Sequence, residues 1–135
     1  MHYLFDACAV LAFINGEFGR EKVLDLLDKA KAGTVRLSMS IVQLLEVYYN
    51  CIYIGGEDEA RAAVASLLAE PITIIEAVSY PIMYEAGRFK TTYSMSLADS
   101  IASATAKCFN AVLITKDSEL QRAEEAGEFS VLWLK

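Results

Sequence analysis

Four acidic side chains of this sequence could work together in metal chemistry: Asp6, Glu46, Asp99 and Asp117. Three of them stand at expected strand ends or helix starts, and Glu46 projects from an apolar helix. Carboxylates packed together without matching lysines repel one another unless they are protonated or bind a cation. Oxygen ligands favour Mg²⁺ or Mn²⁺ over zinc, and such an ion could activate water against a phosphodiester.

The stretch from Ser96 to Asp117 must bring two of these acids together. Ser96 is placed as an N-cap with Asp99 three residues later, which predicts a helix that ends before Asn110. This helix would rise roughly 18 Å, and the apolar run 111–115 would return roughly 16 Å as a strand. Asp99 and Asp117 should therefore lie at the same edge of a parallel sheet, where ligands of open α/β folds bind.

Glu46 is the least ordinary of the four acids. It lies in a helix that Ser40 and Gln43 would open as a capping box and that runs to about Ile54. This helix is apolar nearly all round, so we expect it to be deeply embedded. A carboxylate there is costly unless it is paired or binds a cation. The stripe of Gln43, Glu46 and Asn50 could instead be the solvent edge of the helix.

Each acid also has an ordinary structural interpretation. Asp6 follows the apolar run Tyr3-Leu4-Phe5 and could be an N-cap, as could Asp117 before the next helix. Asp99 could simply complete a capping box. The sequence leaves these alternatives open for each acid taken singly.

Short strands and helices alternate along the rest of the chain. Further strands are expected at 35–38, 72–75 and 131–134, and a helical hairpin bearing several tyrosines surrounds Gly55-Gly56. The aromatic side chains of this hairpin could face a partner or pack in the core. The segment 88–93 (RFKTTY) is a candidate substrate rim, or simply a basic helix end. We predict one βα-alternating domain of the α/β class over residues 1–135.

Composition restricts the class of protein. The 135 residues are 55% hydrophobic and 22% charged, without a run of some 18 apolar residues, so we expect no membrane span. The amino terminus is interpreted as a strand and a helix, not a signal peptide. A net charge of -6 argues against broad nucleic-acid binding. Three cysteines without metal-type spacing indicate neither a disulfide framework nor a zinc motif, which favours a cytoplasmic protein.

The ordered set of motifs resembles the PIN-domain nucleases, in particular the VapC-type toxins. The resemblance rests on Asp6 after a first strand, Glu46 in a helix opened by Ser40, the segment LADSIASATA with Asp99, and Thr115-Lys116-Asp117 at a strand end. It covers essentially the whole chain. Because each motif is short, the specificity comes from the set.

The resemblance implies a three-layer α/β/α sandwich with a mainly parallel sheet of four to five strands. It implies an endoribonuclease dependent on Mg²⁺ or Mn²⁺, often a homodimer, with a small antitoxin that blocks the site. Asp6, Glu46, Asp99 and Asp117 would be the acidic quartet that holds the metal and orients water. Thr115 would support this catalytic site beside Asp117 or contact a metal-bound water.

Two positions depart from the family pattern. Cys8 stands where a small hydroxyl or amide residue is frequent, and Glu119-Leu120 replaces an acidic-aromatic pair. The alternative functions are a PIN-like binding or assembly module without catalysis, and a phosphoryl-acceptor protein. The second lacks both a following acid after Asp6 and a glycine-rich phosphate loop.

Overall fold

The computed structural model describes residues 1–134, and its central element is one parallel β-sheet. The strands lie in the order β3-β2-β1-β4-β5, and every neighbouring pair is parallel. In chain order the elements are β1 (His2–Phe5), α1 (Ala7–Asn15), α2 (Arg20–Lys31), β2 (Arg36–Ser40), α3 (Ile41–Leu68), β3 (Ile72–Ile75), α4 (Tyr80–Tyr93), α5 (Leu97–Cys108), β4 (Val112–Thr115), the 3₁₀ turn η1 (Ser118–Leu120), α6 (Gln121–Glu125) and β5 (Val131–Trp133).

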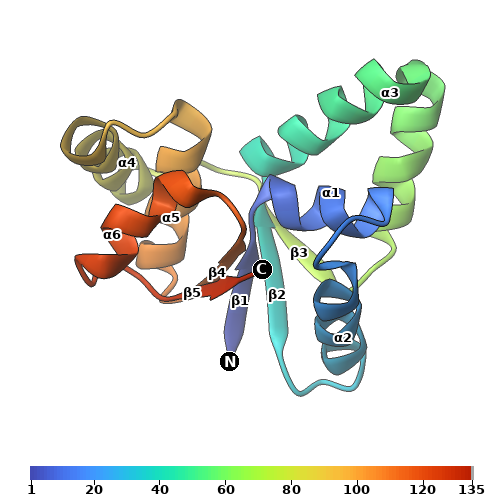
Figure 1. Cartoon of the computed structure of the whole chain (residues 1–135), viewed down its shortest axis with the longest axis horizontal. Coiled ribbons are helices and arrows are strands. Elements are labelled where there is room, and N and C mark those ends of the chain that lie inside the picture. Colours follow the sequence, from blue (N-terminus) through green and yellow to red (C-terminus); the bar gives the residue numbers. More distant parts are fainter. Residues whose placement is uncertain (135) are drawn as a thin grey trace.

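Helices cover both faces of the sheet. Figure 1 shows α1, α2 and α3 on one side, and α4, α5 and α6 on the other. Neighbouring residues of β1 serve the two sides, because Phe5 packs in the core under α1 to α3 and Leu4 in the core under α4 to α6. The expected three-layer α/β/α sandwich is therefore confirmed, with five strands.

The helix ends follow local signals in the sequence. Helix α1 begins after Asp6 and ends at Gly16, whose φ of 66° suits glycine. Helix α5 begins after Ser96, whose hydroxyl accepts the Asp99 amide at 3.1 Å. Asn110, with φ of 51°, follows α5 in the left-handed region. These ends fix the lengths of the segments that lead to the candidate site.

Helix α3 is a hairpin of two arms that meet at Gly56. The φ of 87° and ψ of 174° at this residue are not helical and are open essentially only to glycine. The chain turns sharply there, so the two arms form an open V in Figure 1. This agrees with the helical hairpin expected around the glycine pair.

Two expectations for the first arm of α3 are wrong. Ser40 accepts the Val42 amide at 3.2 Å, but Gln43 does not complete a capping box, because its Oε1 accepts no hydrogen bond from the described residues and its Nε2 donates to the carbonyl of Ala98. The arm is also not deeply embedded, since Leu45 is 56% exposed and Ile54 is 72% exposed. Its apolar surface exceeds what one contact with the sheet can cover.

Within residues 1–134, the structure has no helix that combines the length and the apolar character needed to cross a membrane.

Candidate functional site

Strands β1 and β4 deliver two of the four acids to one edge of the sheet. They are parallel neighbours with Phe5 opposite Ile114, and the Asp6 amide donates to the Ile114 carbonyl at 3.0 Å. Asp6 follows β1 directly and Asp117 follows β4 by two residues. Both carboxylates therefore stand at the carboxyl ends of the central strands.

Asp99 completes a cluster of three carboxylates. It lies in the first turn of α5, and one oxygen from each of Asp6, Asp99 and Asp117 falls within 4.8 Å of the others. Helix α5 leads away from this edge of the sheet and β4 leads back to it. The structure thus confirms that Asp99 and Asp117 lie at the same edge. A single ion could contact all three side chains after small rotations.

Glu46 lines the same small pocket but stands apart from this trio. The pocket, of about 160 Å³, is also lined by Asn50, one turn further along α3. Gln43, on the same stripe, is buried against the first turn of α5. Glu46 and Asn50 therefore face the acidic pocket, while Gln43 faces α5, so this stripe is not the solvent edge of the helix.

Backbone amides and one hydroxyl hold two of the acids in place. Asp6 Oδ1 accepts the Ala7 amide at 2.8 Å, and Asp117 Oδ1 accepts the Glu119 amide at 3.0 Å. The buried Thr115 hydroxyl donates to Asp6 Oδ2 at 2.8 Å and accepts the Asp117 amide at 3.0 Å. Asp6 and Asp117 therefore cap helix starts and also converge on the pocket, so the two interpretations of these residues are compatible.

The Asp99 carboxylate accepts no backbone amide or hydroxyl of residues 1–134; besides burial and the charges of Asp6 and Asp117, side-chain hydrogen bonds with the acids Asp117 and Glu119 raise its pKa. Its side chain is part of a residue only 6% exposed, and its Oδ2 has no hydrogen-bond partner. Ser96 caps the backbone amide of Asp99, so the carboxylate itself caps nothing. An unpaired carboxylate oxygen in a buried position destabilises the protein unless another ligand meets it.

The carboxylates of the site are not balanced by basic side chains among residues 1–134. Burial raises the pKa of Asp6, and burial together with the charges of Asp6 and Asp117 raises the pKa of Asp99 to about 8. Burial, followed by the charge of Asp6, also raises the pKa of Glu46. No lysine, arginine or histidine of the described chain lines the pocket. The oxygen donors, their charge and the unpaired Asp99 oxygen fit a divalent cation.

Cys8 belongs to the same site. From the sequence alone, this residue is only a departure from the family pattern. Its Sγ lies 3.5 Å from Asp6 Oδ2 and 3.3 Å from Thr115 Oγ1, and it accepts the Lys116 amide at 3.4 Å. Burial, then the charge of Asp6, raises the pKa of Cys8 to about 12. The spacing from Asp6 to Cys8, across a helix start, is the signal that could have placed it here.

The segment 88–93 does not supply a free cationic rim. Arg88 donates to Glu85 and, through two nitrogens, to Glu128, which also accepts from Lys107 and Tyr93. Lys107 belongs to the last turn of α5, at the opposite end from Asp99. The interpretation of Arg88 as part of a substrate rim is therefore wrong, because its charge is used in a structural network.

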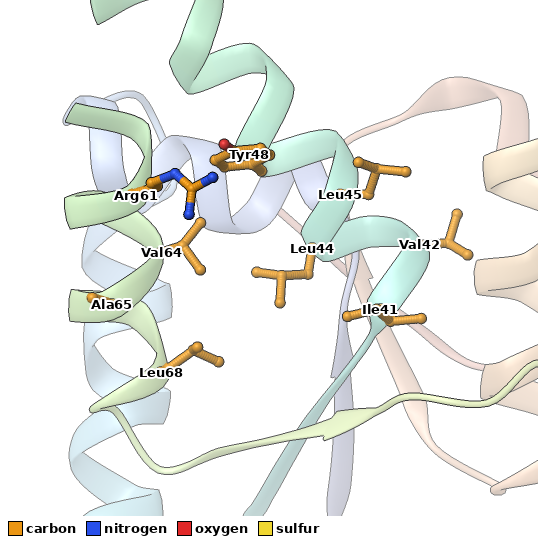
Figure 2. Close-up of a pocket in the computed structure, with 9 residues that line it drawn as sticks. All are labelled: Ile41, Val42, Leu44, Leu45, Tyr48, Arg61, Val64, Ala65 and Leu68. Atoms are coloured by element: carbon orange, nitrogen blue, oxygen red, sulfur yellow. The ribbon is translucent and has the colours of Figure 1, made fainter. Parts of the chain in front are cut away.

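A second surface feature is an apolar groove between the two arms of α3 (Figure 2). Its volume is about 680 Å³, and Arg61 and Tyr48 lie near one another at one end. Leucine, isoleucine and valine side chains from both arms form the rest of the wall shown in Figure 2. The groove is open and contains no carboxylate, so it is chemically distinct from the acidic pocket.

The fold and the acidic edge correspond to a known class of proteins. The family model described as the PIN domain matches residues 3–126, and the chain therefore belongs to the PIN domain family. This match confirms the family resemblance in the sequence. Comparison with curated protein sequences gives no match.

Solved structures share the fold over their whole length at low sequence identity. VapBC2 from Rickettsia felis, bound to a DNA fragment from its promoter, superposes with a TM-score of 0.77 at 18% identity and covers 100% of both chains. A toxin-antitoxin complex from Klebsiella pneumoniae gives 0.71 at 22% identity, covering 98% of both chains. VapBC-1 from nontypeable Haemophilus influenzae gives 0.72 at 17% identity, covering 99% of this chain and 98% of the other.

Proposed function

We propose that this PIN-domain protein is a metal-dependent endoribonuclease whose Asp6, Asp99 and Asp117 hold Mg²⁺ or Mn²⁺. The observation that carries the proposal is the Asp99 carboxylate, which is buried, unpaired at Oδ2 and directed to a pocket without a basic residue. The free energy lost in placing it there is recovered if a cation binds. Membership of the PIN family supports the nuclease class.

The chain's own residues divide the work between them. Thr115 and the amides of Ala7 and Glu119 keep Asp6 and Asp117 in fixed orientations, so little entropy is lost when they bind an ion. When bound, the cation would act as a Lewis acid on the scissile phosphate and on a water molecule. Glu46, half-buried at the pocket wall with a raised pKa, would orient the attacking water and accept its proton.

RNA cleavage with and without metal tests this proposal. We expect cleavage of some members of a panel of structured RNAs in Mg²⁺ or Mn²⁺, and none in chelator. Asp6→Asn and Asp99→Asn should abolish cleavage while remaining folded. Asp25→Asn is the matched control, because Asp25 is exposed on α2 and pairs only with Lys29. Cleavage that persists in chelator, or in both site variants, would contradict the metal mechanism.

We further propose that the protein acts in the cytoplasm as the toxin of a toxin–antitoxin pair. The similar structures from Klebsiella pneumoniae and Haemophilus influenzae, described as a toxin-antitoxin complex and as VapBC-1, support this role. Expression of the chain should arrest growth through Asp6 and Asp99, and co-expression of a cognate antitoxin should restore it. Growth arrest that survives Asp99→Asn would indicate another cause of toxicity.

A homodimer is the proposed assembly, and its surface is the exposed apolar one at the start of α4. Tyr84 on this surface is 72% exposed, and Tyr80, the first residue of the helix, is 75% exposed. Tyr84→Asp should shift the sedimentation coefficient from dimer to monomer. Phe18→Asp is the control, because Phe18 is equally exposed at 72% but lies in the turn before α2. A monomeric wild-type protein at micromolar concentration would refute the dimer.

A further inference from the structure

The thiol of Cys8 is in direct contact with a carboxylate that the proposed nuclease uses. Its sulfur lies 3.5 Å from Asp6 Oδ2, and Cys8 lines the same pocket as Asp99 and Asp117. The Mg²⁺ chemistry proposed above has no use for sulfur, since Mg²⁺ prefers oxygen ligands and six-coordinate geometry. The thiol is therefore a group at the site that the nuclease mechanism leaves unexplained.

The separation of sulfur and oxygen matches that of a shared zinc ion. With a Zn–S bond of about 2.3 Å, a Zn–O bond of about 2.0 to 2.2 Å and a tetrahedral angle, the two ligand atoms stand about 3.5 to 3.7 Å apart. The observed 3.5 Å between Cys8 Sγ and Asp6 Oδ2 lies at the lower end of this range. An ion could thus join these two atoms with little movement of either side chain.

A second observation points to a ligand in this pocket. Asp99 Oδ2 is buried without a hydrogen-bond partner, in a residue only 6% exposed. An oxygen of Asp99 lies within 4.8 Å of oxygens of Asp6 and Asp117. Zinc takes four ligands, and these carboxylates offer oxygens beyond the first sulfur–oxygen pair.

We propose that Cys8 makes this pocket a site for thiophilic divalent cations, of which Zn²⁺ is the biological example. The consequence for activity rests on the proposed function: Zn²⁺ would occupy Asp6 and exclude Mg²⁺ or Mn²⁺. As the sulfur–zinc bond forms, the thiol proton passes to buffer, and the ion replaces the contact between Sγ and Asp6 Oδ2. Softer ligands select Zn²⁺ over Mg²⁺, so a serine at this position would remove the selectivity.

The test uses the 135-residue chain with Cys8 as its only thiol. Cys51→Ser and Cys108→Ser remove the buried and the exposed cysteine, and Cys8→Ser in the same background is the matched control. Cd²⁺ is the probe, because a cadmium–thiolate bond gives a charge-transfer absorption in the ultraviolet. We expect one equivalent of this band in the Cys8-only protein and none in the control.

Affinities measured by calorimetry give a second readout that needs no activity. The ratio of Zn²⁺ affinity to Mn²⁺ affinity should fall at least about 10-fold on Cys8→Ser, as loss of a metal contact typically weakens binding by that factor or more. Asp99→Asn in the Cys8-only protein should weaken Cd²⁺ binding as well. Far-ultraviolet circular dichroism checks that each variant folds, and Cys8→Ala replaces Cys8→Ser if the serine variant does not.

The outcomes separate this inference from the proposed function. No charge-transfer band in the Cys8-only protein, or an unchanged ratio of affinities, overturns the thiophilic site, and normal Mn²⁺ binding would leave the nuclease proposal intact. A band with tight Zn²⁺ binding, together with no Mg²⁺ or Mn²⁺ binding in any variant, supports the thiophilic site and refutes the nuclease metal centre.

Discussion

Replacement of Asp99 by asparagine should stabilise the metal-free protein while it destroys metal binding. Folding raises the pKa of Asp99 from 3.8 to about 8. A carboxyl group whose pKa is higher in the folded state than in the unfolded state stabilises the fold while it is protonated. This stabilisation is complete at pH values below the pKa of the unfolded state, and it is lost as the pH rises through the pKa of the folded state. The metal-free wild type should therefore lose stability between about pH 4 and pH 8, and the asparagine variant should lose less.

The size of the effect follows from this shift in the pKa of Asp99. At about 1.4 kcal/mol per pKa unit the full cost of ionised Asp99 approaches about 6 kcal/mol above pH 8. Water at the pocket mouth and the shared titration with Asp6 screen this charge, so we halve the figure. Asp99→Asn should then raise the free energy of unfolding by about 3 kcal/mol at pH 9 and by about 1 kcal/mol at pH 5.

Urea unfolding of the metal-free proteins, monitored by circular dichroism at both pH values, measures the difference. The same titrations with Mg²⁺ or Mn²⁺ should stabilise the wild type and leave Asp99→Asn unchanged, because the variant lacks one ligand. Asp25→Asn, an exposed acid on α2, is the control and should respond to metal as the wild type does. An Asp99→Asn protein that is less stable than wild type at pH 9 would refute the electrostatic reasoning.

Three further predictions concern stability and can be checked by urea unfolding. Gln43→Ala should cost about 2 to 3 kcal/mol, because it removes a buried hydrogen bond and leaves a cavity, whereas Gln43→Met, which fills the space, should cost about 1 kcal/mol. Equal losses in these two variants would contradict the packing explanation. Glu128→Gln should cost about 1 to 2 kcal/mol, with the loss reduced in high salt, because it weakens the ion pair with Arg88. Folding lowers the pKa of Glu128, so this contribution should be present above the ordinary glutamate pKa and disappear as the pH falls; a loss that is independent of salt and pH would argue against an ionic origin. Gly56→Ala should cost about 1 to 3 kcal/mol through its backbone alone, since an added Cβ meets no atom within 4 Å. Gly55→Ala, in regular helix, should be nearly neutral, because the gain in helix propensity offsets the movement of the flexible Glu59 side chain away from the new Cβ. A neutral Gly56→Ala would show that the corner of α3 tolerates other backbone conformations.

Regular geometry made the acidic cluster predictable from the sequence. The rise per residue of a helix and that of a strand are fixed. The path along the helix from Asp99 and the return path along the strand to Asp117 are therefore nearly equal and opposite. The short apolar run before Asp6 predicts a buried parallel strand, which puts Asp6 at the same edge of the sheet. The structure brings these three side chains together, as expected.

Contacts between distant elements were not predictable in this way. The sequence predicts a capping box for Gln43, yet its side-chain amide donates to the carbonyl of Ala98, which lies 55 positions away on another helix. Only the packing of α3 against α5 decides between these partners. The first arm of α3 is more exposed than the sequence predicts, because a helix that is apolar all round carries no periodic signal to show which face is covered. Arg88 shows the same limit, since its acceptor Glu128 follows α6.

The different support of the three acids bears on how related sequences should be interpreted. Asp6 and Asp117 each bind a backbone amide at a helix start, so a descendant without catalytic activity would still gain stability by keeping them. Asp99 binds no such amide through its carboxylate, and its unpaired oxygen makes it a burden on the metal-free fold. Selection for stability alone would therefore remove Asp99 first. Under the proposed function, an aspartate at that position in a sequence with this fold is the better sign of a working metal site, and its replacement is the earliest mark of a lost one.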